Sequence, residues 1–198
     1  MSGSLYDHAV ALHRRFPDGP LPRDGAPYPD EERQRARPPR PRHSPRRVGA
    51  DTAAVLDNYF SSPQRRIEWL AETLSEVGAP NRLNGHVTAA ALRANRWQVR
   101  RAGRWLVRYG EDRAVVAAGL GLLASDNHDG DIPLLRTIGL LSDAFAPLVS
   151  DALLRRKSGT VALTWLADHT AGWGRVYVVE ALCHRRTPAR GADLRRSR

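Results

Sequence analysis

The sequence predicts an all-α protein, organised as a short α-solenoid of helical hairpins that follows a disordered Arg/Pro-rich N-terminal segment. Apolar residues recur at three- and four-residue steps over most of the chain after residue 50, which is the period of a helix. Glycine, proline and Ser/Asp capping signals divide this region into short helices. A weak internal repeat relates the later helices to the earlier ones, as expected for stacked hairpins.

Charge and composition set the first limits on function. The 198 residues carry 31 Lys and Arg against 21 Asp and Glu, a formal net charge of +10, and Lys157 is the only lysine. A basic chain is attracted to nucleic acid and to acidic surfaces. An arginine bias with abundant Ala, Gly and Pro also follows from a GC-rich coding genome. Cys183 is the only cysteine, so no internal disulfide is predicted.

The ends of the chain give the expected compartment and domain limits. The first residues lack the basic start and apolar run of a signal peptide, and no apolar stretch reaches membrane-spanning length. We therefore expect a cytoplasmic protein with no membrane partner. Three regions are expected: residues 1–50, largely disordered; residues 51–186, the helical domain; and residues 187–198, a frayed basic tail.

Prolines dominate the expected disordered region. Tyr6 to Phe16 predicts a short amphipathic helix, but from Pro17 to Pro45 the prolines are too dense for a helix, because each removes an N–H group and restricts the residue before it. The stretch from Arg33 to Arg47 is nearly free of apolar side chains, so we interpret it as a disordered or polyproline-like linker. Its Pro38-Pro39-Arg40-Pro41 sequence leaves open a PxxP ligand or an anion-binding arm.

Capping signals give the expected helix bounds after residue 50. Ser62 with Pro63 is a favourable helix start, and Gly78 is a stop. Thr88 is expected to cap a long helix that runs to Tyr109. Further helices are expected over residues 51–60 and 111–124, from the Asp131 cap, over 146–156 with Pro147 in its first turn, and over 161–168 and 175–185. The run 176–179 is rich in valine and competes as a strand, but its surroundings favour helix.

An offset of 60 residues relates two parts of this region. Trp105-Leu106 falls on Trp165-Leu166, and the same offset pairs Ala102 with Ala162, Val116 with Val176, and Leu122 with Leu182. A degenerate copy lies between them, which gives three helix pairs. Because one pair cannot bury its apolar face alone, neighbours must stack into an elongated curved array. A non-repetitive helical bundle fits the same short helices and loops.

The middle copy resembles a known repeat. Residues 131–142, Asp-Ile-Pro-Leu-Leu-Arg-Thr-Ile-Gly-Leu-Leu-Ser, followed by Ala152-Leu153, resemble a short HEAT repeat of the phycobilisome-lyase type. The resemblance covers residues 88–185, and helical-repeat proteins of actinobacteria are similar. It implies a HEAT-like α-solenoid. No catalytic residue of the lyases can be matched to a position in this chain.

The helix expected over residues 88–109 carries the clearest candidate binding surface. At 100° per residue, one side of it is apolar. The opposite side collects Arg93, Trp97, Arg100, Arg101, Arg104 and Arg108. Guanidinium groups bind phosphate oxygens and a ring stacks on a base, so this face suits nucleic acid or an acidic partner. The alternative is a solvated or ion-paired outer face, with Trp97 and Trp105 packed against the next repeat.

No other residue set gives a catalytic or metal-binding signature, and no cofactor is predicted. Aligning Gly130 with the glycine of an EF-hand puts Ser125 first and Arg136 last, where Asp and Glu are required. Cys183 and His184 are adjacent, so on a helix they point in different directions. We expect Cys183 to be a buried core thiol.

The functional expectation follows from these exclusions. Inter-repeat packing is the simplest interpretation of Trp165, Asp168, His169 and Trp173, for which HEAT-like DNA glycosylases offer a fold-level analogy. We expect a non-enzymatic protein-binding or scaffold module whose concave face holds another protein. The alternatives are a nucleic-acid-associated protein that uses the Arg/Trp face and, less favoured, a HEAT-like enzyme acting on DNA bases.

Overall fold

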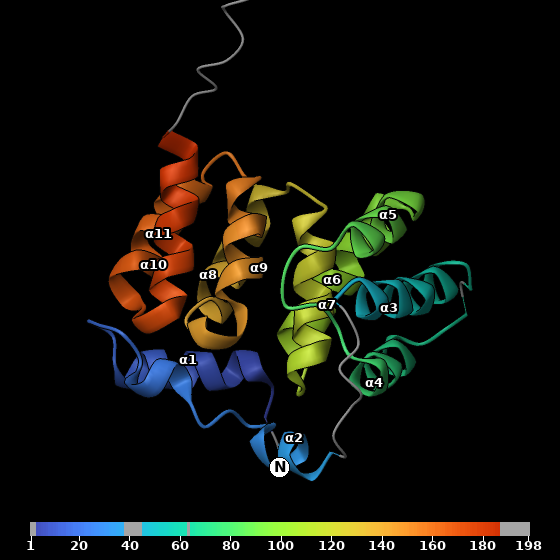
Figure 1. Ribbon diagram of the computed structural model, residues 1–198, viewed down its shortest axis with the longest axis horizontal. Coiled ribbons are helices and arrows are strands. Elements are labelled where there is room, and N and C mark those ends of the chain that lie inside the picture. The colour runs from blue at the N-terminus through green and yellow to red at the C-terminus, as the bar shows by residue number, and fades with distance from the viewer. Residues whose placement is uncertain (1–2, 38–44, 63, 187–198) are drawn as a thin grey trace, which may run out of the picture.

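Helices dominate the part of the chain that the structure describes (Figure 1). The computed structural model describes residues 3–37, 45–62 and 64–186, and within these ranges it contains eleven α-helices, two 3-10 helices and no strand. The all-α prediction is therefore confirmed. The elements are α1 (Leu5–Arg15), η1 (Pro22–Gly25), α2 (Glu31–Ala36), α3 (Pro45–Phe60), α4 (Ile67–Val77), α5 (Gly85–Arg93), α6 (Arg96–Tyr109), α7 (Arg113–Ala124), η2 (Asp129–Asp131), α8 (Ile132–Ile138), α9 (Ser142–Leu154), α10 (Gly159–His169) and α11 (Gly172–Arg186).

Helices α6 to α11 form three pairs of sequence neighbours. α6 packs on α7, α8 on α9, and α10 on α11. The pairs stand side by side, because α9 contacts both α7 and α11 while α8 contacts both α6 and α10 (Figure 1). The paired contacts that the repeat predicts are present.

Two glycines allow α6 and α7 to approach closely. A Cβ atom on Gly119 would lie 2.8 Å from Cβ of Leu106 and 3.0 Å from the carbonyl oxygen of Gly103. A Cβ atom on Gly103 would lie 3.0 Å from the Leu123 side chain. A larger residue at either position would push the two helices apart.

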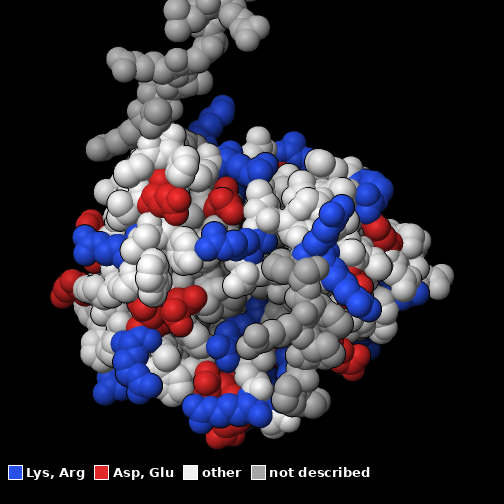
Figure 2. Space-filling model, viewed as in Figure 1, with Lys and Arg blue, Asp and Glu red and all other residues white. Residues whose placement is uncertain are grey.

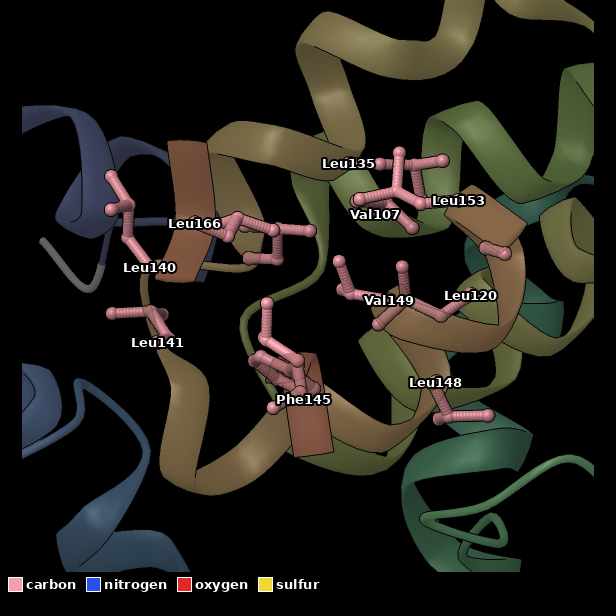
Figure 3. Packing of buried hydrophobic residues seen from close by; sticks show 14 of the residues in the cluster. Val107, Leu120, Leu135, Leu140, Leu141, Phe145, Leu148, Val149, Leu153 and Leu166 are labelled. Carbon is pink, nitrogen blue, oxygen red and sulfur yellow. The ribbon is translucent and has the colours of Figure 1, made fainter. Parts of the chain in front are cut away.

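One apolar cluster joins the three pairs, with α9 at its centre. Figure 3 shows Phe145, Val149 and Leu153 of α9 gathered with side chains of the surrounding helices, which include Val107, Leu120, Leu135 and Leu166. These surrounding residues come one each from α6, α7, α8 and α10. A second cluster lies among α3, α4, α5, α6 and α7. With α1 to α5 packed around the pairs, the outline in Figure 2 is rounded, so the expected elongated array is not seen.

The sequence repeat agrees with burial in the first helix of each outer pair but not in the second. Leu106 and Leu166 are buried, as are Ala102 and Ala162, and Trp105 and Trp165 are partly buried. In contrast, Val116 of α7 is buried whereas Val176 of α11 is exposed. The difference follows from position: α7 packs against α4, α5, α6 and α9, whereas α11 packs against α9 and α10 and is the last helix that the structure describes.

The N-terminal segment of residues 3–37, which we call the strap, is ordered and runs along the edge where the paired helices turn (Figure 1). It contains α1 where a helix was expected from Tyr6 to Phe16. The expectation of disorder is wrong for the rest of the strap and for residues 45–50, which belong to α3. The amide nitrogen of Leu5 donates to the carbonyl of Gly110, 3.0 Å away, at the turn between α6 and α7. At the start of α9, the Ser142 hydroxyl donates to Asp24 over 3.0 Å.

Burial and charge explain why the strap is ordered despite its prolines. Leu5, Ala9, Leu21 and Tyr28 are buried in the main apolar cluster. The carboxylate of Asp30 is also buried, and Arg113 lies 3.0 Å from it at the start of α7. The prediction of no helix between Pro17 and Pro45 is wrong too, because α2 fits between the prolines.

Two helices begin at residues other than those expected from the sequence. The helix expected from Ser62 begins at Ile67, and the helix expected from residue 146 begins at Ser142, which places Pro147 inside α9. Pro147 has no amide N–H to donate to the backbone carbonyl of Asp143, one turn earlier in α9. The proline is tolerated there because Asp143 is exposed. The PxxP sequence, Pro63 and the tail 187–198 lie outside the described residues.

Replacing Leu140 by Asp should unfold the protein or lower the free energy of unfolding by about 4 kcal/mol or more, because it puts an unpaired charge into the main cluster. Leu92→Asp is the matched control, since Leu92 is exposed. Urea titration followed by circular dichroism measures both. Equal stability of the two variants would contradict the packing described here.

Candidate functional site

The six residues of the expected Arg/Trp face do not share one helix. The helix is interrupted at Ala94 and Asn95, so Arg93 is the last residue of α5 and the other five residues lie on α6. Asn84 caps α5 by accepting from the His86 amide over 2.9 Å, and Asn95 caps α6 by accepting from the Trp97 amide over 2.9 Å. The continuous helix over residues 88–109 is therefore a wrong prediction: asparagine at a cap position satisfies amides that would otherwise lack a partner.

Two arginines of this face are neutralised by buried acids. Arg100 binds Asp126 through Nε at 2.5 Å, and Arg96 binds the same carboxylate at 2.7 Å. Arg104 binds Asp131 through Nε at 2.5 Å. Both aspartates are buried in or beside the loop that joins the first pair to the second. Since these arginines compensate buried charge, they serve the fold.

The sequence predicted that the Asp131 side chain caps α8, but it makes no capping hydrogen bond and binds arginines instead. Its second oxygen lies 3.4 Å from Nη2 of Arg156, a fully buried side chain of the turn after α9. The same guanidinium donates to the backbone carbonyls of His128, Ala152 and Leu123. Burial lowers the pKa of Arg156, and the neighbouring Asp131 carboxylate opposes that change.

Two more arginines of the face also have partners within the fold. Arg93 lies 2.6 Å from Asp57 in an exposed ion pair that joins α5 to α3. The guanidinium of Arg108 lies 4.0 Å from the ring centroid of Tyr6, which ties α6 to the strap. Trp97 and Arg101 remain for a binding role. Basic and acidic side chains alternate over the side of the molecule that Figure 2 shows, so this view has no continuous basic surface.

Trp97 and Arg101 lie at a cleft between α3, the start of α4, and α6, which we call the aromatic cleft. Its volume is about 440 Å³. It is lined by Tyr59, Phe60, Ser62, Arg65, Arg66, Ile67, Glu68, Trp97, Gln98, Arg101 and Trp105. The Trp97 side chain is 62% exposed, and the Arg101 guanidinium lies 5.4 Å from its ring centroid.

The other rings of the aromatic cleft are held by packing. Tyr59 and Phe60 meet edge to face, with centroids 5.2 Å apart, and Trp105 lies 5.5 Å from Tyr109. Burial raises the pKa of Tyr59, and Arg101 partly offsets that rise. The helical spacing of Tyr59 and Phe60 predicts that they share one face of a helix, but not that this face borders a cleft. The sequence signal for the cleft is the concentration of aromatic residues around Arg65 and Arg101.

The four residues Trp165, Asp168, His169 and Trp173 do not form a single cluster. Trp165 stacks on His169 with centroids 3.9 Å apart, and His13 of the strap meets both rings. Asp168 and Trp173 are exposed. The expected packing role therefore fits the Trp165–His169 part of the group.

Cys183 is exposed, so the expectation of a buried thiol is wrong. It corresponds to the buried Leu123 in the repeat, but α11 has no described helix on its outer side. Among the described residues, no three His, Cys, Asp or Glu side chains are grouped to hold a metal ion. No described helix is both long and apolar enough to cross a membrane.

Acid should weaken the fold through Asp126. Burial alone would raise the pKa of Asp126, but the hydrogen bonds from Arg100 and Arg96 outweigh burial and lower this pKa to about 2. The contribution of Asp126 is therefore complete above its unfolded pKa near 4 and is lost as pH falls toward 2. We expect Asp126→Asn to cost about 1–2 kcal/mol at pH 7 and to flatten the loss of stability between about pH 4 and pH 2.

Urea titration at a series of pH values measures this effect. Asp168→Asn removes the same charge from an exposed position and is the matched control. A wild-type profile that is superimposable on that of Asp126→Asn would contradict the ion-pair assignment.

Comparison of the sequence and the structure with protein-family models, with curated proteins and with solved structures found no match.

Proposed function

We propose that this protein is a non-enzymatic protein-binding scaffold, in which α6 to α11 are three HEAT-like repeats of a short α-solenoid. The contacts of α7, α9 and α11 with one another, and of α8 with α6 and α10, support this description. So does the equal burial of Leu106 and Leu166 at equivalent positions. Helix pairs stacked in this way form a rigid support for surfaces at the end of the row.

The observation that carries the proposal is an apolar stripe along α11. Trp173 is 72% exposed, Val176 is 49% exposed and Val179 is 41% exposed. Successive residues of an α-helix are about 100° apart, so positions at steps of three stay within one side of it. Val161 at the start of α10 is exposed as well. Exposed apolar groups concentrated on one element mark a protein interaction site.

The partner that fits this stripe is another protein with an apolar helix face. Inside the row, α9 and α11 pack through apolar side chains, and the outer side of α11 presents the same chemistry with no described neighbour. Arg175 and Glu180 are exposed on the same helix, so the stripe has the polar surroundings of an interface. The paired arginines of α6 do not contribute, since buried acids neutralise them.

The stripe can be tested with a double substitution, Val176→Asp with Val179→Asp. With the full chain as bait in extract of the native host, the wild type should retain a partner protein that the variant loses. With the recovered partner purified, Trp173→Ala should weaken its affinity about 30-fold, as expected for a central aromatic residue at an interface. Biolayer interferometry measures that affinity.

The control is Thr164→Asp, which places a charge on an exposed position of α10. It should retain the partner, and all variants should keep the wild-type melting temperature. Retention of the same partner by the double variant would contradict the proposal. Sedimentation showing a wild-type dimer that the double variant loses would contradict it as well, because the stripe would then belong to a second copy of the chain.

A further inference from the structure

We propose that the aromatic cleft is a second binding site, which holds one nucleotide of a single nucleic-acid strand. The base stacks on Trp97, and the adjoining phosphates lie on Arg101 and Arg65. This site is independent of the stripe on α11, since it is built from α3, α4 and α6 at the other end of the row (Figure 1).

Trp97 has the properties of a stacking platform. Its backbone is fixed at the start of α6, because its amide donates to the Asn95 cap. Its ring lies beside the Arg101 guanidinium and is mostly exposed. An exposed ring is open to stacking, and every base offers a flat π-face to it.

The charge of the cleft suits phosphate. Three guanidinium groups, those of Arg65, Arg66 and Arg101, line it against one carboxylate, that of Glu68. Glu68 accepts a hydrogen bond from Arg66 over 3.2 Å, so this ion pair neutralises one of the three guanidinium groups. Arg65 lies over the ring of Trp69, 4.3 Å from its centroid, and this contact keeps its full positive charge. Two cations therefore remain for two phosphates.

The shape of the cleft selects an unpaired base. A volume of about 440 Å³ suits one small ligand unit. In a duplex the faces of the bases are covered by their neighbours, so none could stack on Trp97 without leaving the helix. An acidic peptide would pair with the arginines but would offer no flat group to the rings. A single strand satisfies the rings and the charges together.

The test uses the full-length protein and a fluorescein-labelled strand of about twelve thymidines, followed by fluorescence anisotropy. Two phosphate contacts predict that a tenfold rise in salt weakens the affinity about 25-fold. Arg101→Gln should reduce that factor to about fivefold, since one contact remains. Trp97→Ala should weaken binding about tenfold at fixed salt, through the lost stack.

Matched controls separate the cleft from general attraction and from the stripe. Arg14→Gln removes the same charge from an exposed position of α1, and Trp173→Ala removes an exposed tryptophan from α11. Both should bind the strand as the wild type does. Trp97 and Arg101 are exposed, so their variants should keep the wild-type melting temperature.

Four results would overturn the proposal. They are no binding by the wild type at low salt, an equal loss in Arg14→Gln, an equal affinity for the same sequence as a duplex, and displacement of the strand by an equal concentration of free thymidine monophosphate. None of these results bears on the stripe of α11, whose own variants test it.

Discussion

The buried ion pair of Arg156 and Asp131 joins the first helix pair, α6 and α7, to the second, α8 and α9. A guanidinium group without water is costly unless an acid and carbonyl oxygens replace the lost hydration. Here the Arg156 guanidinium reaches the end of α7 at Leu123, the loop at His128 and the end of α9 at Ala152, as well as the carboxylate. Asp131 in turn binds Arg104 of α6. The loop between the first and second pairs is therefore fixed by charge, while the helices around it are fixed by apolar packing.

This network decides which side of α6 is free. At about 100° per residue the helix has three sides. Val99, Ala102, Gly103, Leu106 and Val107 face the core; Arg96, Arg100 and Arg104 face the acids; and Trp97, Gln98, Arg101 and Trp105 face the aromatic cleft. The acids draw the central arginines to one side, so the rings and Arg101 are left at the cleft. On this strongly basic helix, only the side at the cleft therefore remains for the proposed binding site.

Local patterns were enough to predict much of the fold. The period of apolar residues gave the helices of the three pairs, and the expected stop at Gly78 and the expected end at Tyr109 are where the structure has them. One failure was local, because the Asn95 cap divides the helix expected over residues 88–109. Others arose where a distant residue decided the outcome. The ordering of the strap depends on the pairing of Asp30 with Arg113, which are far apart in the chain.

The candidate site was predicted only in part, for the same reason. The spacing of Arg96, Arg100 and Arg104 is visible in the sequence, but the acids that neutralise them come from a loop after the next helix. The face therefore looked more basic than it is. Trp97 and Arg101 were in the predicted set, whereas Tyr59 and Arg65 were not, because only the folded chain brings α3 and α4 beside α6.

The two proposed surfaces lie at opposite ends of one rigid row. The aromatic cleft is at the end formed by α3 to α6, and the apolar stripe is on α11 at the other end (Figure 1). The main apolar cluster joins α6 to α11, and the second cluster joins α3, α4 and α5 to α6 and α7, so a packed core lies between the two surfaces. A strand in the cleft and a protein on the stripe would therefore be held at a fixed separation. The helix pairs between the two surfaces set that separation.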